Sequence, residues 1–164
     1  MELRAPTRED LEEVRKWRSN CRHVLRTPYL QTKEMQENFY DEVVCKSKNS
    51  RWWSVYNSQG LVGFTGLSNI EWENGLAEIS LIIDPLYHGQ GYGRRIVELV
   101  LSEGFYNMGL KTIYGECYQC NPAIEFWRKL TEEHGGYYTM IPRRKLWQGQ
   151  LYDALHFSVW KGVN

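Results

Sequence analysis

Gly89, Gly91 and Gly93 stand at alternating positions between an apolar segment and a basic one in this 164-residue chain. Glycine lets the backbone approach a ligand closely and adopt positive φ. Backbone N–H groups at a helix start, helped by the helix dipole, form a site for phosphate. Arg94 and Arg95 add positive charge at the end of this loop. The pattern therefore predicts a phosphate-binding loop, and the alternative is a tight strand-to-helix turn without a ligand.

The spacing of these glycines excludes two common phosphate-binding motifs. A P-loop requires G-x-x-x-x-G-K-[ST], and no Lys-Ser or Lys-Thr pair follows them. The dinucleotide fingerprint G-x-G-x-x-G also fails, because Ile96 stands where its third glycine belongs. The ligand of this loop must therefore belong to another class.

Cysteines offer a second kind of chemistry. Cys117 and Cys120 have C-x-x-C spacing, but they lie at a strand end, whereas a thioredoxin-like pair opens a helix. No second pair supplies the other ligands of a zinc site, and Cys21 and Cys45 show no framework spacing. We therefore expect no metal site and keep a thiol redox protein as an alternative only.

The amino-acid composition limits the classes of partner that the chain can bind. The chain has 20 basic and 20 acidic residues, whereas binding to nucleic acid or to an anionic membrane depends on clustered Lys and Arg. No apolar run is long enough to span a membrane, and the N-terminus lacks the apolar core of a secretory signal. At about 100–200 residues per domain, the length predicts a single domain over residues 1–164. We expect a cytoplasmic protein that binds neither nucleic acid nor membrane.

Hydrophobic periodicity predicts the elements that position these residues. Thr7, three residues before Asp10, forms a capping box, and Thr32 is a second helix start. The second helix presents on one face Met35, Phe39 and Val43. The later elements are strands at 51–56, 61–70 and 77–83, a helix at 94–107, a strand at 111–118, a helix at 122–131, and strands at 137–146 and 151–160.

With a short strand around Leu3, the order is β-α-α-β-β-β-α-β-α-β-β. It predicts an α/β fold whose sheet has mixed strand direction. Gly63 and Gly66 lie inside the strand at 61–70, which indicates a bulge or a close approach there. The glycine loop joins the strand at 77–83 to the helix at 94–107.

Motifs of one known family occur along most of this chain. Residues 88–93 (HGQGYG) read as Q/R-x-x-G-x-G/A with His88 in the first slot, and residues 3–20 resemble L-R-x-x-x-x-x-D-L-x-x-x-x-x-W-R-N. Residues 121–130 (NPAIEFWRKL) resemble N-x-x-A-I-x-F-Y-E-K-L-G-F, with the asparagine one residue nearer the alanine, and residues 149–153 (GQLYD) match a G-x-x-x-D turn before the last strand. Together they resemble the GNAT superfamily of acyl-CoA-dependent N-acetyltransferases, in particular its RimJ/RimL-like members, which share the element order.

The resemblance implies acetyl-CoA as co-substrate. In this family the strand before the loop splays from its neighbour, and its backbone, here at Ile82 and Ile83, pairs with the pantetheine arm. Asn121 would bind the pantetheine amide, or cap the helix that follows it. Trp127 would also face the cofactor. The residues that would wrap the pyrophosphate are His88, Gly89, Gln90, Gly91, Tyr92, Gly93 and Arg94.

The implied reaction is direct attack of a neutral amine on the thioester. It needs a base, and the family often places a glutamate where Glu78 interrupts the apolar strand. The alternative is that Glu78 points to solvent. A backbone N–H near Ile83 would polarise the thioester carbonyl.

The family's general acid is missing from this chain. Its tyrosine aligns with Trp127, whose indole N–H is not a usable acid. Tyr118, Tyr137 or Tyr138 could substitute, or coenzyme A could leave as the thiolate without an acid.

The sequence thus predicts an N-acetyltransferase that acetylates a primary amine: a small amine, an amino sugar or a protein N-terminus. The alternative in another class is a catalytically silent acyl-CoA-binding protein. A second copy of the chain, in a homodimer, is a further candidate partner. The acceptor would be chosen by the first two helices, whose aromatic and acidic residues favour a small amine over a polyanion. These are Trp17, Tyr29, Phe39 and Tyr40 with Glu34, Glu37, Asp41 and Glu42.

Overall fold

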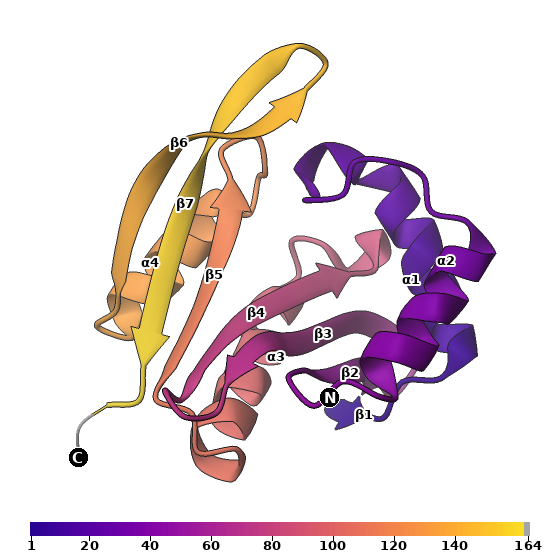
Figure 1. Ribbon diagram of the computed structural model, residues 1–164, viewed down its shortest axis with the longest axis horizontal. Coiled ribbons are helices and arrows are strands. Elements are labelled where there is room, and N and C mark those ends of the chain that lie inside the picture. Colours follow the sequence, from indigo (N-terminus) through magenta and orange to yellow (C-terminus); the bar gives the residue numbers. More distant parts are fainter. Residues whose placement is uncertain (163–164) are drawn as a thin grey trace.

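The computed structural model describes residues 1–162 and contains one seven-stranded sheet in the order β1-β2-β3-β4-β5-β7-β6 (Figure 1). The strands are β1 (Glu2–Arg4), β2 (Arg51–Asn57), β3 (Gly60–Glu71), β4 (Leu76–Ile83), β5 (Thr112–Tyr118), β6 (Tyr137–Trp147) and β7 (Gln150–Trp160). The helices are α1 (Arg8–Asn20), α2 (Lys33–Phe39), α3 (Tyr92–Ser102) and α4 (Ile124–Glu133). The predicted α/β class and element order are confirmed. The predicted domain, 1–164, includes two residues outside the described part and stays a prediction.

The sheet splits between β4 and β5. These neighbours are parallel and pair only along Leu76–Glu78 with Thr112–Tyr114, whereas every other pairing in the sheet is antiparallel. Beyond Glu78, β4 stays on β3 as far as Ile83, while β5 stays on β7 as far as Tyr118. The two halves therefore diverge as a V, which Figure 1 shows between β4 and β5. The splay that the resemblance implies is present.

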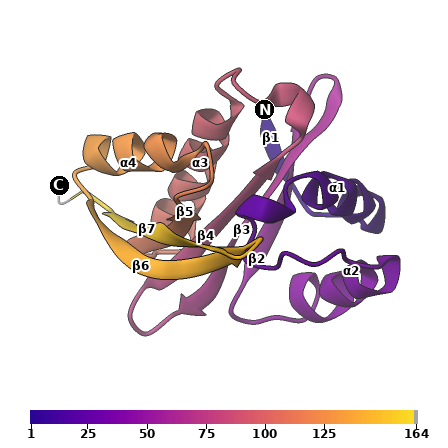
Figure 2. The same ribbon diagram turned by 90° about the horizontal axis from the view of Figure 1, so that it is seen from above.

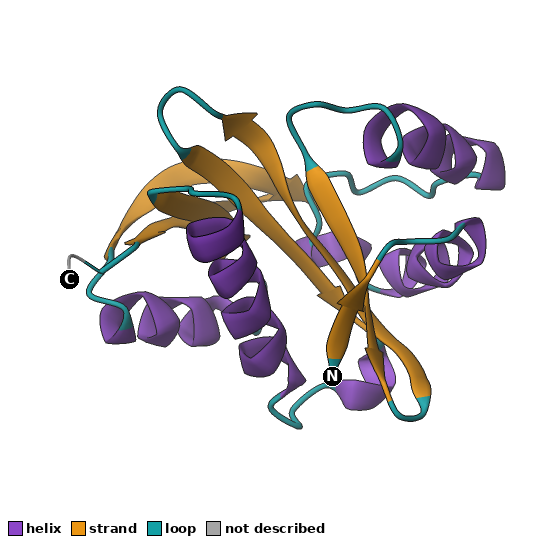
Figure 3. Cartoon of the chain, turned by 90° about the horizontal axis from the view of Figure 1, so that it is seen from below, coloured by secondary structure: helices purple, strands orange, loops and turns teal. Residues whose placement is uncertain are grey.

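The helices lie in pairs on opposite faces of the sheet. Figure 2 and Figure 3 show α3 and α4 on one face and α1 and α2 on the other. Successive side chains of a strand point to opposite faces, so Ile82 packs with the cluster under α1 and Ile83 with the core under α3. The buried stripe of α3 is the predicted one: Ile96, Val97, Val100 and Leu101, with Phe105 in the π-helical turn that follows.

The capping box of α1 also links that helix to the sheet. The Thr7 hydroxyl accepts a hydrogen bond from the Asp10 N–H, and Asp10 accepts one from the Thr7 N–H. The buried Asp10 carboxylate accepts two more, from the Ser54 hydroxyl at 2.7 Å and from the Tyr56 hydroxyl at 2.5 Å. The box therefore fixes the start of α1 on β2.

The predicted apolar face of α2 is wrong. Thr32 caps the helix as expected, but Met35 is 49% exposed. The buried position is Gln36, and Phe39 and Tyr40 pack beside it against the α1 cluster. The buried face is thus displaced by one residue, about 100° around the helix, because α2 packs against α1 through the side that carries Gln36.

The glycines inside β3 mark close approaches. A Cβ on Gly66 would lie 2.3 Å from the Trp52 ring, and one on Gly63 would lie 3.1 Å from the Ile82 carbonyl oxygen. Trp52 itself stacks on Phe64, with 5.3 Å between ring centroids. Among the described residues, no helix is both long and apolar enough to cross a membrane.

Candidate active site

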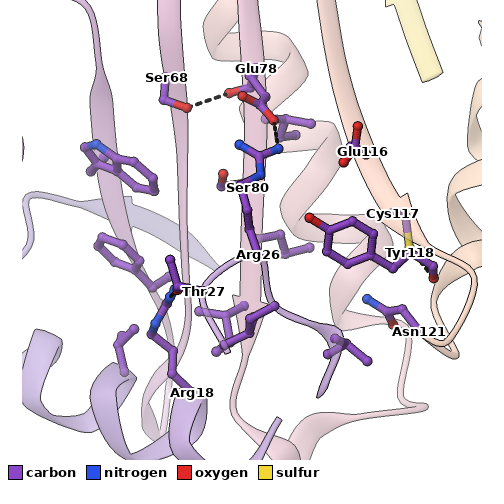
Figure 4. A pocket seen from close by; sticks show the side chains of 18 of the residues that line it. Arg18, Arg26, Thr27, Ser68, Glu78, Ser80, Glu116, Cys117, Tyr118 and Asn121 are labelled. Atoms are coloured by element: carbon purple, nitrogen blue, oxygen red, sulfur yellow. Dashed lines mark hydrogen bonds and ion pairs between the residues drawn. The ribbon is translucent and has the colours of Figure 1, made fainter. Parts of the chain in front are cut away.

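A cavity of about 470 Å³ lies where β4 and β5 diverge. Its volume is within the usual range of small-molecule sites. The second half of β4, the end of β5, α1 and the segment between α1 and α2 contribute its walls (Figure 4). Its main polar side chains are Arg18, Arg26, Thr27, Ser68, Glu78, Ser80, Glu116 and Asn121.

Glu78 is held inside this cavity. The residue is 7% exposed, and its carboxylate accepts hydrogen bonds from Arg26 Nη2 at 2.5 Å and from Asn69 Nδ2 at 2.7 Å. Asn69 has φ +49°, a conformation that asparagine tolerates, at the irregular end of β3. The alternative in which Glu78 points to solvent is therefore wrong. The hydrogen bond from Arg26 to Glu78 raises the pKa of Arg26 above its ordinary value.

The segment 21–32 between α1 and α2 closes one side of the cavity and carries Arg26 and Thr27. Three side chains from outside the segment donate to its backbone carbonyls. Lys145 Nζ donates to the Leu25 carbonyl, and Cys120 Sγ donates to the His23 carbonyl at 3.4 Å. Arg15 Nη1 donates to the Gln31 carbonyl at 3.1 Å. This irregular segment is therefore anchored on both α1 and the β6 side of the sheet.

Of the tyrosines considered as acids, only Tyr118 lines the cavity. Tyr118 ends β5, is buried, and directs its hydroxyl into the cavity near Arg26 (Figure 4). The Tyr138 hydroxyl instead donates to Glu132 at 2.9 Å, and Tyr137 is exposed.

Trp127 lines the cavity as a packed core residue. It is 9% exposed and stacks on Phe157, with 4.6 Å between centroids and 17° between ring planes. Asn121 lies nearby on the turn after β5, where its Oδ1 accepts a hydrogen bond from the Ala123 N–H at 2.9 Å. This bond closes the turn before α4, whose N-cap is Ala123 without a side-chain cap, so the predicted helix cap at Asn121 is wrong.

The glycine loop presents backbone. Gly89 and Gly91 have φ of +73° and +78°, and a Cβ on either would meet nothing within 4 Å. Gly91 is the N-cap of α3, and no side chain caps the free N–H groups of the first turn. Positive φ, open space and uncapped N–H groups fit a bound pyrophosphate.

The side chains of this loop face protein partners. His88 Nε2 lies 3.0 Å from the Ile83 carbonyl oxygen, and Gln90 Nε2 donates to the Leu86 carbonyl at 2.7 Å. The Tyr92 hydroxyl accepts a hydrogen bond from Asn57 Nδ2 at 3.1 Å. Arg94 pairs with Glu133 at 2.5 Å, which raises the pKa of Arg94, so of the two expected charges at the loop that of Arg94 is paired.

Cys117 is not an activated thiol. Burial raises the pKa of the Cys117 thiol to about 12, and nucleophilic cysteines need the opposite shift. Cys117 and Cys120 are both free thiols. Among residues 1–162, no group of three or more His, Cys, Asp or Glu side chains is arranged to hold a metal ion.

Several cavity residues were not predicted from sequence. Of the aromatic and acidic residues expected to choose the acceptor, only Phe39 lines the cavity, and Arg18, Arg26 and Glu116 were missed. Arg18 left a signal, because it follows Leu11 and Val14 at helical spacing on the buried face of α1. Arg26 left none, because its segment has no periodic pattern.

Comparison with known proteins identifies relatives. The family described as "Acetyltransferase (GNAT) domain" matches residues 1–126, and no curated protein matches. Spermidine N-acetyltransferase SpeG from Vibrio cholerae, in complex with CoA and spermine, is 24% identical, with TM-score 0.85 over 97% of this chain and 94% of that one. A mutant of the same enzyme gives TM-score 0.83 at 24% identity over 98% and 95%. At these identities the structural likeness shows the fold.

Proposed function

The chain belongs to the GNAT acetyltransferase family and is an acetyl-CoA-dependent N-acetyltransferase, and we propose that its acceptor amine binds in the β4–β5 cavity beside Glu78. The observation that carries this proposal is the position of one buried carboxylate. Glu78 is the last residue of β4 that pairs with β5, so its buried carboxylate lies where the two strands separate and the free edge of β4 begins.

We propose that acetyl-CoA, which supplies the thioester, is held mainly by backbone. The N–H groups of the glycine loop from His88 to Arg94 would bind its pyrophosphate, with Gly91 placing them at the α3 N-terminus. The backbone of Ile82 and Ile83 has no β5 partner and would pair with the pantetheine arm. Asn121 and Trp127 would contact the arm where it enters the cavity.

Glu78 acts as the base in this proposal. The acceptor arrives as an ammonium ion, which replaces Arg26 as a hydrogen-bond donor to the Glu78 carboxylate. Glu78 takes one proton, and the neutral amine then attacks the thioester carbonyl carbon. The new C–N bond forms as the C–S bond breaks, and the electron pair of that bond leaves on sulfur. The nitrogen then loses its extra proton to the thiolate, which gives the neutral amide and free coenzyme A. A positioned base contributes roughly 10²–10⁴-fold to such a reaction.

Tyr118 is the proposed donor to the departing sulfur. It is buried at the cavity wall, whereas the indole of Trp127 has no acidic proton and is packed on Phe157. A thiol has a pKa near about 8.5, so its thiolate is a good leaving group and a hydrogen bond from Tyr118 is sufficient.

We place the chain with the RimJ/RimL-like members on the G-x-x-x-D motif. Its Asp153 accepts a hydrogen bond from the Arg143 N–H at 3.0 Å, where Arg143 has φ +57° at the irregularity in the β6–β7 pairing. The motif thus has a structural task in this hairpin. A cytoplasmic location, a homodimer and a protein N-terminus as acceptor remain proposals that rest on the sequence.

An acceptor panel with acetyl-CoA tests the function. The panel contains small amines, amino sugars, a peptide with a free N-terminus and spermidine, the substrate named for the similar SpeG structures. Amine-dependent release of free thiol, with the acetylated amine detected by mass spectrometry, is expected. If acetyl-CoA raises the melting temperature but no amine releases thiol, the chain is the silent acyl-CoA-binding protein.

A further inference from the structure

Arg18, on the last turn of α1, places a guanidinium in the cavity without a carboxylate beside it (Figure 4). Its Nε donates to Gln31 Oε1 at 3.1 Å and its Nη2 to Thr27 Oγ1 at 2.6 Å. Among the described residues, no Asp or Glu oxygen lies within 4.0 Å of it, the distance that defines the salt bridges of this structure. Both of its partners are neutral, so they orient the charge and do not cancel it.

Other arginines of the chain differ from Arg18 in this respect. Arg26 and Arg144 pair with Glu78 and Glu116, the two carboxylates of the cavity. Arg22 and Arg51 have no carboxylate either, but each lies over a tryptophan ring outside the cavity. Within residues 1–162, Arg18 is the one arginine that both lines the cavity and has no carboxylate partner.

The cost of this arrangement indicates that something pairs with Arg18. Burying a charge without a counter-ion is unfavourable, and burial lowers the pKa of Arg18 from its ordinary value. Arginine nevertheless stays protonated in proteins. Its remaining N–H groups form a fork, and this geometry suits two hydrogen bonds to a carboxylate or a phosphate.

The other end of the cavity has the opposite preference. Glu78 would bind the ammonium of the acceptor, and Arg26, displaced from Glu78, would then add a second free guanidinium. Figure 4 shows Arg18 and Glu78 at opposite ends of this view. A polycation would meet both guanidiniums, whereas an amine with an anionic group would be complementary at both ends.

We propose that the acceptor carries an anionic group, a carboxylate or a phosphate, which Arg18 binds while the amine lies at Glu78. This inference rests on the proposed function, because it takes the cavity as the acceptor site. It makes Arg18 a residue that determines specificity and assigns it no part in the chemical step.

Matched acceptors test the inference. The pairs are 4-aminobutyrate with butylamine and glucosamine 6-phosphate with glucosamine, and spermidine is the polycation. In wild type we expect kcat/KM to favour an anionic member by about 10- to 100-fold, as a charge-assisted hydrogen bond would. The pair with the larger ratio identifies carboxylate or phosphate. Arg18→Gln should bring that ratio close to one without changing the KM for acetyl-CoA.

Two controls keep the test decisive. Arg18→Lys keeps the charge and loses the fork, so it should retain part of the preference. It also tests the inference if Arg18→Gln folds poorly. Calorimetric titration of the same amines into the complex with coenzyme A measures binding without chemistry. If the anionic amines bind through Arg18 but none is acetylated, the inference stands and the proposed catalysis fails. Preference for spermidine or the neutral amines, no binding of either anionic amine, or an unchanged ratio in Arg18→Gln overturns the inference.

Discussion

The glycine loop follows the C-terminal end of β4, the acceptor cavity lies beside residues 78–82 of that strand, and the two are built in opposite ways. The loop offers backbone N–H groups from consecutive residues, and its side chains, such as Arg94 and Tyr92, are bound to other parts of the protein. The cavity offers side chains from distant segments: Arg18 from α1, Glu78 from β4 and Tyr118 from β5. In this account acetyl-CoA, which the family shares, is bound by backbone, whereas the acceptor, which varies between members, is bound by side chains.

This difference has a functional consequence. Side chains of the cavity can change without altering the backbone that holds the cofactor, so acceptor choice is separable from acetyl-CoA binding. Substitutions in the cavity should change turnover, and substitutions in the loop should change cofactor affinity.

Glu78→Gln should have the largest effect, a fall in turnover of roughly 10²–10⁴-fold, because it removes the base. Acetyl-CoA should still raise the melting temperature, since Glu78 is remote from the loop in this account. Steady-state kinetics and thermal melts with acetyl-CoA measure the two effects. Near-normal turnover with the same acid limb of the pH profile would assign the base elsewhere, for instance to an ordered water.

Gly91→Glu should abolish acetyl-CoA binding. Gly91 has φ +78°, and a glutamate there would place a side chain and a negative charge where the pyrophosphate binds. At a ligand concentration of 100 Kd, the lost stabilisation is about 2.7 kcal/mol. Gly149 offers a matched control, since it has the same φ and equally open space in the β6–β7 turn. Gly149→Glu should leave the acetyl-CoA shift intact, and unchanged affinity in Gly91→Glu would make the loop assignment wrong.

Tyr118→Phe should lower turnover by roughly 10- to 100-fold at unchanged acetyl-CoA affinity, because the departing sulfur loses its hydrogen-bond donor. A thioester with a more acidic thiol should recover most of the loss, since a better leaving group needs less help. Equal losses with both thioesters would argue that the ring of Tyr118 only shapes the cavity.

Trp127→Tyr should have the smallest effect on catalysis. Trp127 stacks on Phe157 in the core, so the smaller ring should cost about 1–3 kcal/mol of stability with no kinetic gain. Melting temperature and turnover, measured on the same variant, check this. Raised turnover at unchanged stability would mean that the missing acid limits the rate.

The same contrast explains what could be predicted from sequence. The capping box at Thr7, the strand-to-helix turn of the glycine loop and the buried stripe of α3 depend on residues close in the chain, and each was predicted correctly. The buried face of α2 was not, because α1 selects it. The ion pair of Arg94 was not predicted, because its partner, Glu133, lies on another helix. Arg26 was missed because its place depends on how segment 21–32 folds across the cavity.

A crystal structure with coenzyme A bound tests the central claim most directly. The account predicts pyrophosphate oxygens at hydrogen-bond distance, about 2.7–3.2 Å, from the backbone nitrogens of residues 91–94. It also predicts a pantetheine arm along the free edge of β4 that ends in the cavity beside Glu78. A pyrophosphate bound anywhere else, or an arm that does not pass between β4 and β5, would contradict it.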